Sequence, residues 1–225
     1  MANNQNIQEE NNQAVSQAVS SVEVFLKENG KTLTTIVTVI VLAVAAIMLL
    51  SKFVFKPAKE AAMAAAAPAE AYFQQANFEQ ALNGDGNVPG LADIISEYGK
   101  KAGNGVFFEA AACQLQLKNY SEALNYLKSY KSKDKIMKAR ALCCMGDAYA
   151  GLDNNAAALK SYKAAAAMAD NDFAANYLLK AGIAAEDLGN TAEALACYKQ
   201  IKVKYPNTIE AVDIDKYISR INSAK

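Results

Sequence analysis

The chain has 225 residues, of which 52% are hydrophobic and 20% are charged, so it can build a hydrophobic core and does not have a disordered composition. It carries 23 basic and 23 acidic side chains, and this balance argues against the basic surface that nucleic-acid binding requires. It contains no histidine, the most frequent general base and metal ligand, so we expect no enzyme, no metal site, no cofactor and no small-molecule substrate.

The first 31 residues are predicted to form an N-terminal tail. Residues 1–20 are rich in Asn, Gln, Ser and Glu and contain few large apolar side chains, a composition typical of disorder. Residues 21–29 contain four larger apolar side chains, which favour a short amphipathic helix at a membrane surface that ends at Gly30.

A run without charged side chains extends from Thr32 to Ser51. At about 1.5 Å per residue, a helix of this length crosses a hydrocarbon core of about 30 Å. Lys52 can reach the lipid headgroups from the end of the run, so we predict a transmembrane helix over 32–55. A cleaved signal peptide is the alternative, although the run is longer than the apolar region of such peptides. The lysines on the two sides of the run are nearly balanced, so charge does not set the orientation.

The segment 56–103 is predicted to form an Ala-rich pair of helices. Pro68 marks a helix start or a kink in its first part. The sequence Asn-Gly-Asp-Gly-Asn at 83–87 is typical of a turn between helices, and it lacks the final glutamate of a calcium-binding loop. Apolar residues then follow helical spacing up to Gly99.

An internal repeat occupies the segment 104–208. The sequence Asn-Tyr-Ser-Glu-Ala-Leu at 119–124 recurs in altered form at 155–159 and at 190–195. Its alanines, Ala123, Ala158 and Ala194, have the spacing of the tetratricopeptide repeat (TPR), a helix–turn–helix unit of about 34 residues. The pattern predicts an all-α fold in which a single transmembrane helix is followed by an α-solenoid of TPR units.

Alignment on these alanines predicts three units and a closing helix. The units span 104–137, 139–172 and 175–208, and the capping helix spans 209–225. Small residues at Ala111, Gly146 and Gly182 let the two helices of a unit approach closely, while larger residues fill the gaps between units. The first unit departs from the pattern, because Leu127 stands at a position that is aromatic in the other two.

The first helices of TPR units line a concave face, which is the predicted partner-binding groove. Its predicted members are Phe108, Ala112, Leu115, Arg140, Asp147, Asn176, Leu179, Ile183 and Glu186. This mixture of apolar and charged side chains suits an extended or helical peptide better than a small polar metabolite. Coverage of some apolar positions by the N-terminal helix or by the closing helix is the alternative.

The four cysteines are predicted to be packing residues rather than ligands. Cys143 and Cys144 are adjacent, while Cys113 and Cys197 lie on other repeat helices, so the spacing does not match a zinc site. A disulfide from Cys113 to Cys143 or Cys144 is the alternative if the domain is extracytoplasmic.

Several sequence blocks extend the pattern beyond the repeats. After the apolar span come Ala-Leu-Asn-Gly-Asp-Gly at 81–86, Ile-Ile-Ser-Glu-Tyr at 94–98 and Asp-Lys-Tyr-Ile at 215–218. In these blocks the chain resembles the YfgM-like family of membrane-anchored TPR proteins, ancillary subunits of the SecYEG translocon, in its Bacteroidetes-type version.

The resemblance implies a place and a set of partners. It implies a single-pass protein of the bacterial inner membrane with a cytoplasmic N-terminus and periplasmic repeats. The implied partners are translocon subunits, a periplasmic chaperone or prolyl isomerase, and nascent secreted chains. From the residues alone, a scaffold of another cell-envelope complex is equally compatible.

Overall fold

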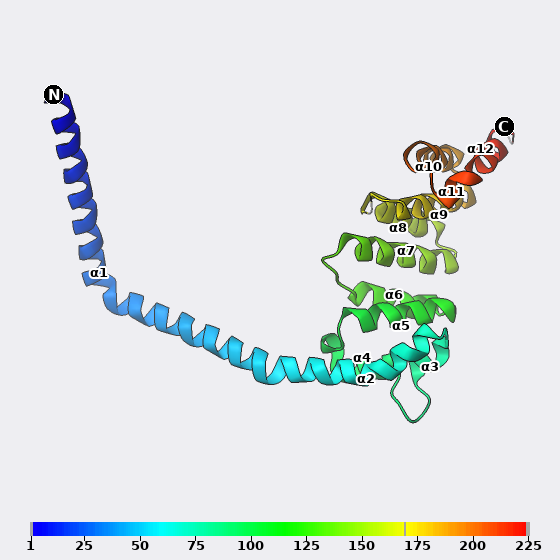
Figure 1. The fold of residues 1–225 in the computed structure, drawn as a ribbon, viewed down its shortest axis with the longest axis horizontal. Helices are drawn as coiled ribbons and strands as arrows, with labels where there is room; N and C mark the ends of the chain where they lie inside the picture. The colour runs from blue at the N-terminus through cyan, green and yellow to red at the C-terminus, as the bar shows by residue number, and fades with distance from the viewer. Residues whose placement is uncertain (1, 169, 224–225) are drawn as a thin grey trace. The chain divides into compact units, whose positions relative to one another are not determined.

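The computed structural model describes residues 2–168 and 170–223. All regular secondary structure within these ranges is helical, which confirms the predicted all-α class, and the helices of the C-terminal part form the predicted solenoid (Figure 1). The chain divides into two compact units, Met1–Pro57 and Ala58–Lys225, and each is described by itself.

The N-terminal unit is built on α1, Ala2–Leu50, followed by a π-helical turn, Ser51–Phe55. Here the structure differs from the predicted disordered tail over 1–20 and from the predicted helix end at Gly30, because α1 runs through both. Ala, Gln and Glu, which favour helix, are frequent in this segment, and a glycine costs only about 1 kcal/mol inside a helix. Figure 1 shows α1 as a bent helix.

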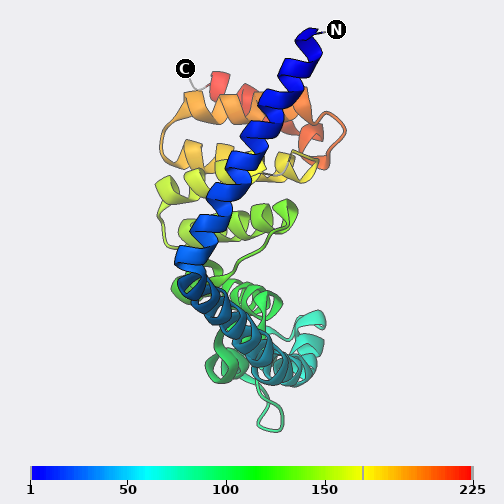
Figure 2. The ribbon, with the colours of Figure 1, turned by 90° about the vertical axis from the view of Figure 1, so that its left-hand side faces the viewer.

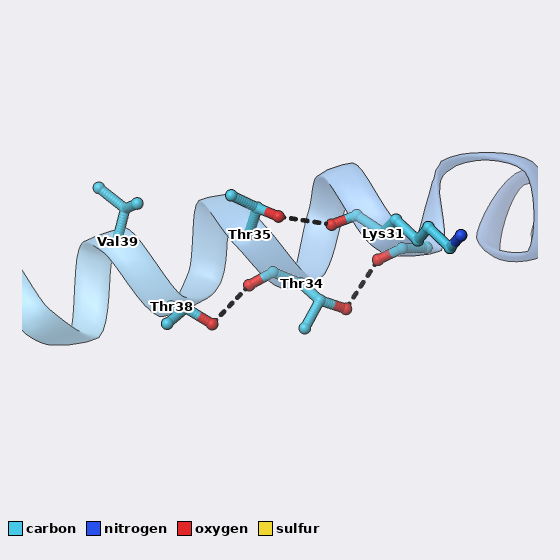
Figure 3. A pocket seen from close by; sticks show the side chains of 6 residues that line it. Lys31, Thr34, Thr35, Thr38 and Val39 are labelled. Carbon is cyan, nitrogen blue, oxygen red and sulfur yellow. Dashed lines mark hydrogen bonds between the residues drawn. The ribbon is translucent and has the colours of Figure 1, made fainter.

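Three threonines in α1 turn their hydroxyl groups back onto the helix. Thr34, Thr35 and Thr38 donate to the carbonyl oxygens of Gly30, Lys31 and Thr34 at 2.7, 2.8 and 2.7 Å (Figure 3). Their polar groups are therefore satisfied without water or a neighbouring segment. The shallow hollow beside them is bordered by this one helix only, so it lacks the enclosing walls of a binding site.

One helical stretch, Lys27–Gln74, contains a window that is long and apolar enough to cross a membrane. Its large apolar side chains between Ile36 and Phe55 are exposed. The predicted span 32–55 therefore coincides with a helix that presents an apolar surface to its surroundings.

The C-terminal unit is a stack of helix pairs. Its elements are α2 (Lys56–Gln74), α3 (Phe78–Asn83), α4 (Leu91–Tyr98), a 3-10 turn (Gly99–Ala102), α5 (Asn104–Gln116), α6 (Tyr120–Ser129), α7 (Lys135–Gly151), α8 (Asn155–Met168), α9 (Phe173–Asp187), α10 (Thr191–Lys204), α11 (Ile209–Val212) and α12 (Ile214–Ser223). From α5 to α10 each helix packs on the next, and α12 packs on α10 (Figures 1 and 2). The segment 56–103 thus holds three helices instead of the predicted pair, and the predicted closing helix is split into α11 and α12.

Four tight turns join the two helices of a pair, and all four share one geometry. The residues with positive φ in these turns are Ala76 (60°), Lys118 (61°), Asp153 (57°) and Gly189 (71°). Each is followed by an asparagine whose N–H donates to a carbonyl five residues earlier: Asn77 to Tyr72, Asn119 to Gln114, Asn154 to Tyr149 and Asn190 to Ala185, at 2.8–2.9 Å. The α2–α3 hairpin is therefore built like the three predicted units.

The sequence carried a signal for this additional hairpin. Ala-Asn-Phe-Glu-Gln-Ala-Leu at 76–82 matches the turn motif at 118–124. The inserted α4 and the 3-10 turn lengthen the spacing between these two motifs beyond the repeat period. A search for that period therefore does not find the α2–α3 hairpin. The α3 helix ends at Asn83, and the loop after it is held to α2 because the Tyr72 hydroxyl donates to Asp85 at 2.7 Å.

The turn geometry predicts opposite effects of glycine at two lysine positions. Replacing Lys118 by glycine is expected to raise the free energy of unfolding by about 0.5–1 kcal/mol, because a left-handed backbone is strained for every residue except glycine. The matched change Lys160→Gly, at an exposed position inside α8, is expected to lower the free energy of unfolding by about 1 kcal/mol. Thermal unfolding followed by circular dichroism measures both, and equal effects of the two changes would contradict the assignment.

Candidate functional site

Two adjoining hollows lie along the face that the first helices of the pairs build. The first has a volume of about 680 Å³ and is bordered by the α2–α3 hairpin, α5 and α7. The second has a volume of about 400 Å³ and is bordered by α7 and α9. Both are lined by Met137, Arg140, Cys144 and Asp147, so they form one continuous feature, which we call the groove.

Six of the predicted groove residues border these hollows. Phe108, Ala112 and Leu115 line the first hollow, where their spacing places them on one face of α5. Arg140 and Asp147 of α7 line both hollows. Asn176 of α9 lines the second hollow only. The structure thus brings together residues from three successive units.

The three other predicted residues, all on α9, do not border the groove. Leu179 is half-buried against the core, and the Ile183 side chain is exposed. Glu186 accepts hydrogen bonds from the Tyr198 hydroxyl and from Arg220 of α12. The closing helix therefore contacts Glu186 at this end of the predicted face, while the predicted apolar position Ile183 stays exposed.

Aromatic rings form much of the wall of the first hollow. Phe73 and Phe78, from the α2–α3 hairpin, meet edge to face with their centroids 6.0 Å apart. Phe108 is 5.4 Å from the Tyr130 ring, and the Arg140 guanidinium lies 5.7 Å from the Phe108 centroid. Half-exposed rings of this kind can bury apolar side chains of a partner, since aromatic residues dominate the energetics of protein interfaces.

A paired charge network lies where the two hollows meet. The Lys180 ammonium donates to the two carboxylate oxygens of Asp147 at 2.7 and 2.9 Å, and the Tyr162 hydroxyl donates to the same carboxylate at 2.8 Å. Burial, the largest single influence, lowers the pKa of Lys180, but the hydrogen bond to Asp147 and the nearby negative charge together outweigh it, and the pKa lies above its usual value. These charges satisfy one another and keep α7 and α9 in register.

Glu109 is a groove residue that the repeat positions did not identify. It lines the first hollow, and its Oε2 atom is buried without a hydrogen-bond partner among the described residues. Burial, and secondly the negative charge of Glu70 on α2, raise the pKa of Glu109 to about 7. The signal in the sequence was the presence of one acidic residue in the otherwise uncharged α5, beside Phe108.

The cysteines are free thiols in helix interfaces. Cys113, Cys143 and Cys197 are buried and Cys144 is half-buried. Burial raises the pKa of Cys113 and Cys143 to about 12 and that of Cys144 and Cys197 to about 11. At neutral pH all four are protonated, so they have low reactivity as nucleophiles or metal ligands.

The comparisons with known proteins agree with this architecture at the level of the repeat. Residues 177–208, within the predicted third unit, match the tetratricopeptide repeat family model. No curated protein matches the chain significantly. The chain therefore contains a TPR, a protein–protein interaction module, in α9 and α10.

Proposed function

We propose that this chain is a non-enzymatic adaptor that is anchored in the bacterial inner membrane and binds peptide segments of other proteins in its groove. In this proposal the repeats lie in the periplasm and assist protein translocation at the SecYEG translocon. The bound segments belong to translocon subunits, to a periplasmic chaperone or prolyl isomerase, or to secreted chains.

The observation that carries the proposal is the groove itself. The two hollows join along α5, α7 and α9, so side chains from three successive helix pairs border one groove, an arrangement suited to a chain of residues. Its walls combine aromatic rings with a few charged groups at fixed places. TPR domains use this face for peptide recognition as a consequence of their curvature.

The apolar helix supports a place at the membrane. The last aromatic residue of the predicted span is Phe55, and the first buried residue of the repeat unit is Ala62. Only a few residues therefore separate a membrane-spanning helix from the groove-bearing domain. In this proposal the span therefore tethers the groove-bearing domain to the membrane through a short connection.

The resemblance to YfgM-like proteins supports the translocon as the site of action. The resembling blocks are not confined to the repeats: 81–86 forms the end of α3 and the loop after it, and 94–98 belongs to α4. Both segments precede the three predicted units, so the resemblance includes a part of the chain that distinguishes it from a plain repeat array.

Photo-crosslinking in living cells tests this proposal. A benzophenone amino acid at Gln116, an exposed position at the border of the first hollow, is expected to give adducts with a translocon subunit, a periplasmic chaperone or a secreted chain. The same amino acid at Lys160, exposed on α8 and outside the groove, is expected to give none of these adducts.

Two results would contradict the proposal. Adducts from Gln116 with components of another envelope complex would favour the scaffold alternative. An alkaline phosphatase fused after Lys225 should be active in cells if the repeats are periplasmic, and an inactive but intact fusion would exclude the translocon–chaperone role.

A further inference from the structure

We propose that the groove selects peptide segments that place a lysine or arginine side chain against Glu109, within the first hollow. This inference rests on the proposed peptide-binding function and adds its chemical specificity. The occupant is therefore an apolar segment that carries a basic residue.

The first argument is the state of the Glu109 carboxylate. Its Oε2 atom has no donor among the described residues, although the side chain borders an open hollow. A buried acceptor without a partner costs free energy that a donor brought by the occupant would recover. A basic side chain supplies both the donor and the compensating charge.

The second argument is the distribution of the other charges. Asp147, the other carboxylate of the first hollow, is already paired with Lys180 at 2.7 Å. Arg140 lies over the Phe108 ring and forms no ion pair within the described part of the chain. Among the described residues, Glu109 is thus the carboxylate lining this hollow that has no paired cation.

The third argument is the sign of the field at Glu109. Glu70 on α2 acts on Glu109 with a charge of the same sign. A cation placed at Glu109 would therefore be attracted by two carboxylates. The rings of Phe73, Phe78 and Phe108 border the same hollow and can accept the aliphatic stem of a lysine or the plane of an arginine.

The ionisation of Glu109 makes the selection dependent on pH. The groups to consider around it are Glu70 on α2, Cys113 on α5 and Arg140 on α7, which lines the same hollow. The pKa of Glu109 is about 7, so at acidic pH its carboxyl group is protonated. A cation that pairs with this carboxylate must therefore bind against the cost of removing that proton. Affinity for a basic segment is therefore expected to rise between pH 6 and pH 8.

A matched set of peptides tests the inference on the full chain in lipid nanodiscs. Three fluorescein-labelled peptides of equal length alternate Leu and Phe with Ser and differ in one central residue, which is Lys, Gln or Glu. Fluorescence anisotropy should show the Lys peptide binding about tenfold more tightly than the Glu peptide at pH 8, a difference of about 1.4 kcal/mol. In Glu109→Gln this ratio is expected to fall below about twofold.

The control variant is Glu122→Gln, which removes the same charge from an exposed position of α6 outside the groove. It is expected to keep the preference for the Lys peptide. Equal binding of all three peptides would overturn the inference about Glu109 but would remain consistent with the proposed peptide-binding function. Tighter binding of the Glu peptide would assign the selectivity to Arg140 instead, and no binding of any peptide would overturn both the inference and the proposed function.

Discussion

Replacing Gly182 by alanine is expected to lower the free energy of unfolding by about 1–3 kcal/mol. A Cβ atom at this position would overlap the ring of Tyr198. That ring cannot move aside, because the Tyr198 side chain is fully buried, its hydroxyl donates to Glu186, and its centroid lies 5.2 Å from that of the tilted Tyr217 ring. In a domain of this size the melting temperature should fall by several degrees, measured by thermal unfolding of the full chain in detergent.

Two further variants separate the steric effect from a general effect of alanine. Gly105→Ala, where a Cβ atom meets nothing within 4 Å, is expected to be neutral or slightly stabilising. The first unit has Ala111 and Leu127 at the corresponding places, packed in one cluster. The double change Gly182→Ala with Tyr198→Leu should therefore cost less than the sum of its single changes, and strict additivity would refute the steric explanation.

Glu109→Gln is expected to raise the free energy of unfolding by about 1–3 kcal/mol at pH 8. The carboxylate pKa is raised from 4.5 to about 7, first by burial and then by Glu70, so its ionised form destabilises the folded state. At 1.36 kcal/mol per pKa unit the penalty reaches about 3 kcal/mol, and partial exposure of the side chain reduces it. Urea unfolding of the full chain at fixed pH measures the difference.

The pH dependence of this effect has a defined sign. Below pH 4.5 Glu109 is protonated in the folded and unfolded chains and contributes nothing. Between pH 4.5 and about 7 the folded chain holds the proton more tightly, so the Glu109 contribution to stability falls as pH rises. Above pH 7 the penalty is complete and constant.

The stabilising effect of Glu109→Gln should therefore grow between pH 5 and pH 8. The change Glu122→Gln removes an exposed carboxylate of α6 and is expected to alter stability by no more than about 0.5 kcal/mol across this range. A gain from Glu109→Gln that is the same at pH 5 and pH 8 would show that burial of the charge is not its cause.

Together these two predictions distinguish a structural position from a functional one. Gly182 is required by the fold, since its absence of a side chain makes room for Tyr198. Glu109 is unfavourable to the fold, since an apolar or amide side chain would stabilise it better. Residues that reduce stability at a concave surface are typical of binding sites, and this contrast singles out Glu109 within α5.

The sequence by itself determined the features that depend on neighbours along the chain. The apolar run over 32–51, the alanine spacing of the repeats and the small residues Gly146 and Gly182 were all evident, because helical period and close packing impose local patterns. These patterns also located five residues of α5 and α7 that border the groove, since one face of a helix is set by residue spacing.

Only the tertiary structure decided which parts of the concave face are available. It showed that the α2–α3 hairpin forms a wall of the first hollow, because an inserted helix had moved its turn out of the repeat period. It showed that Arg220 of α12 pairs with Glu186, so this predicted groove carboxylate already has a partner. It also brought Glu70 and Glu109 together from helices far apart in the chain. Burial and charge pairing depend on these long-range contacts, and this is the physical reason why Glu109 became visible only in the folded chain.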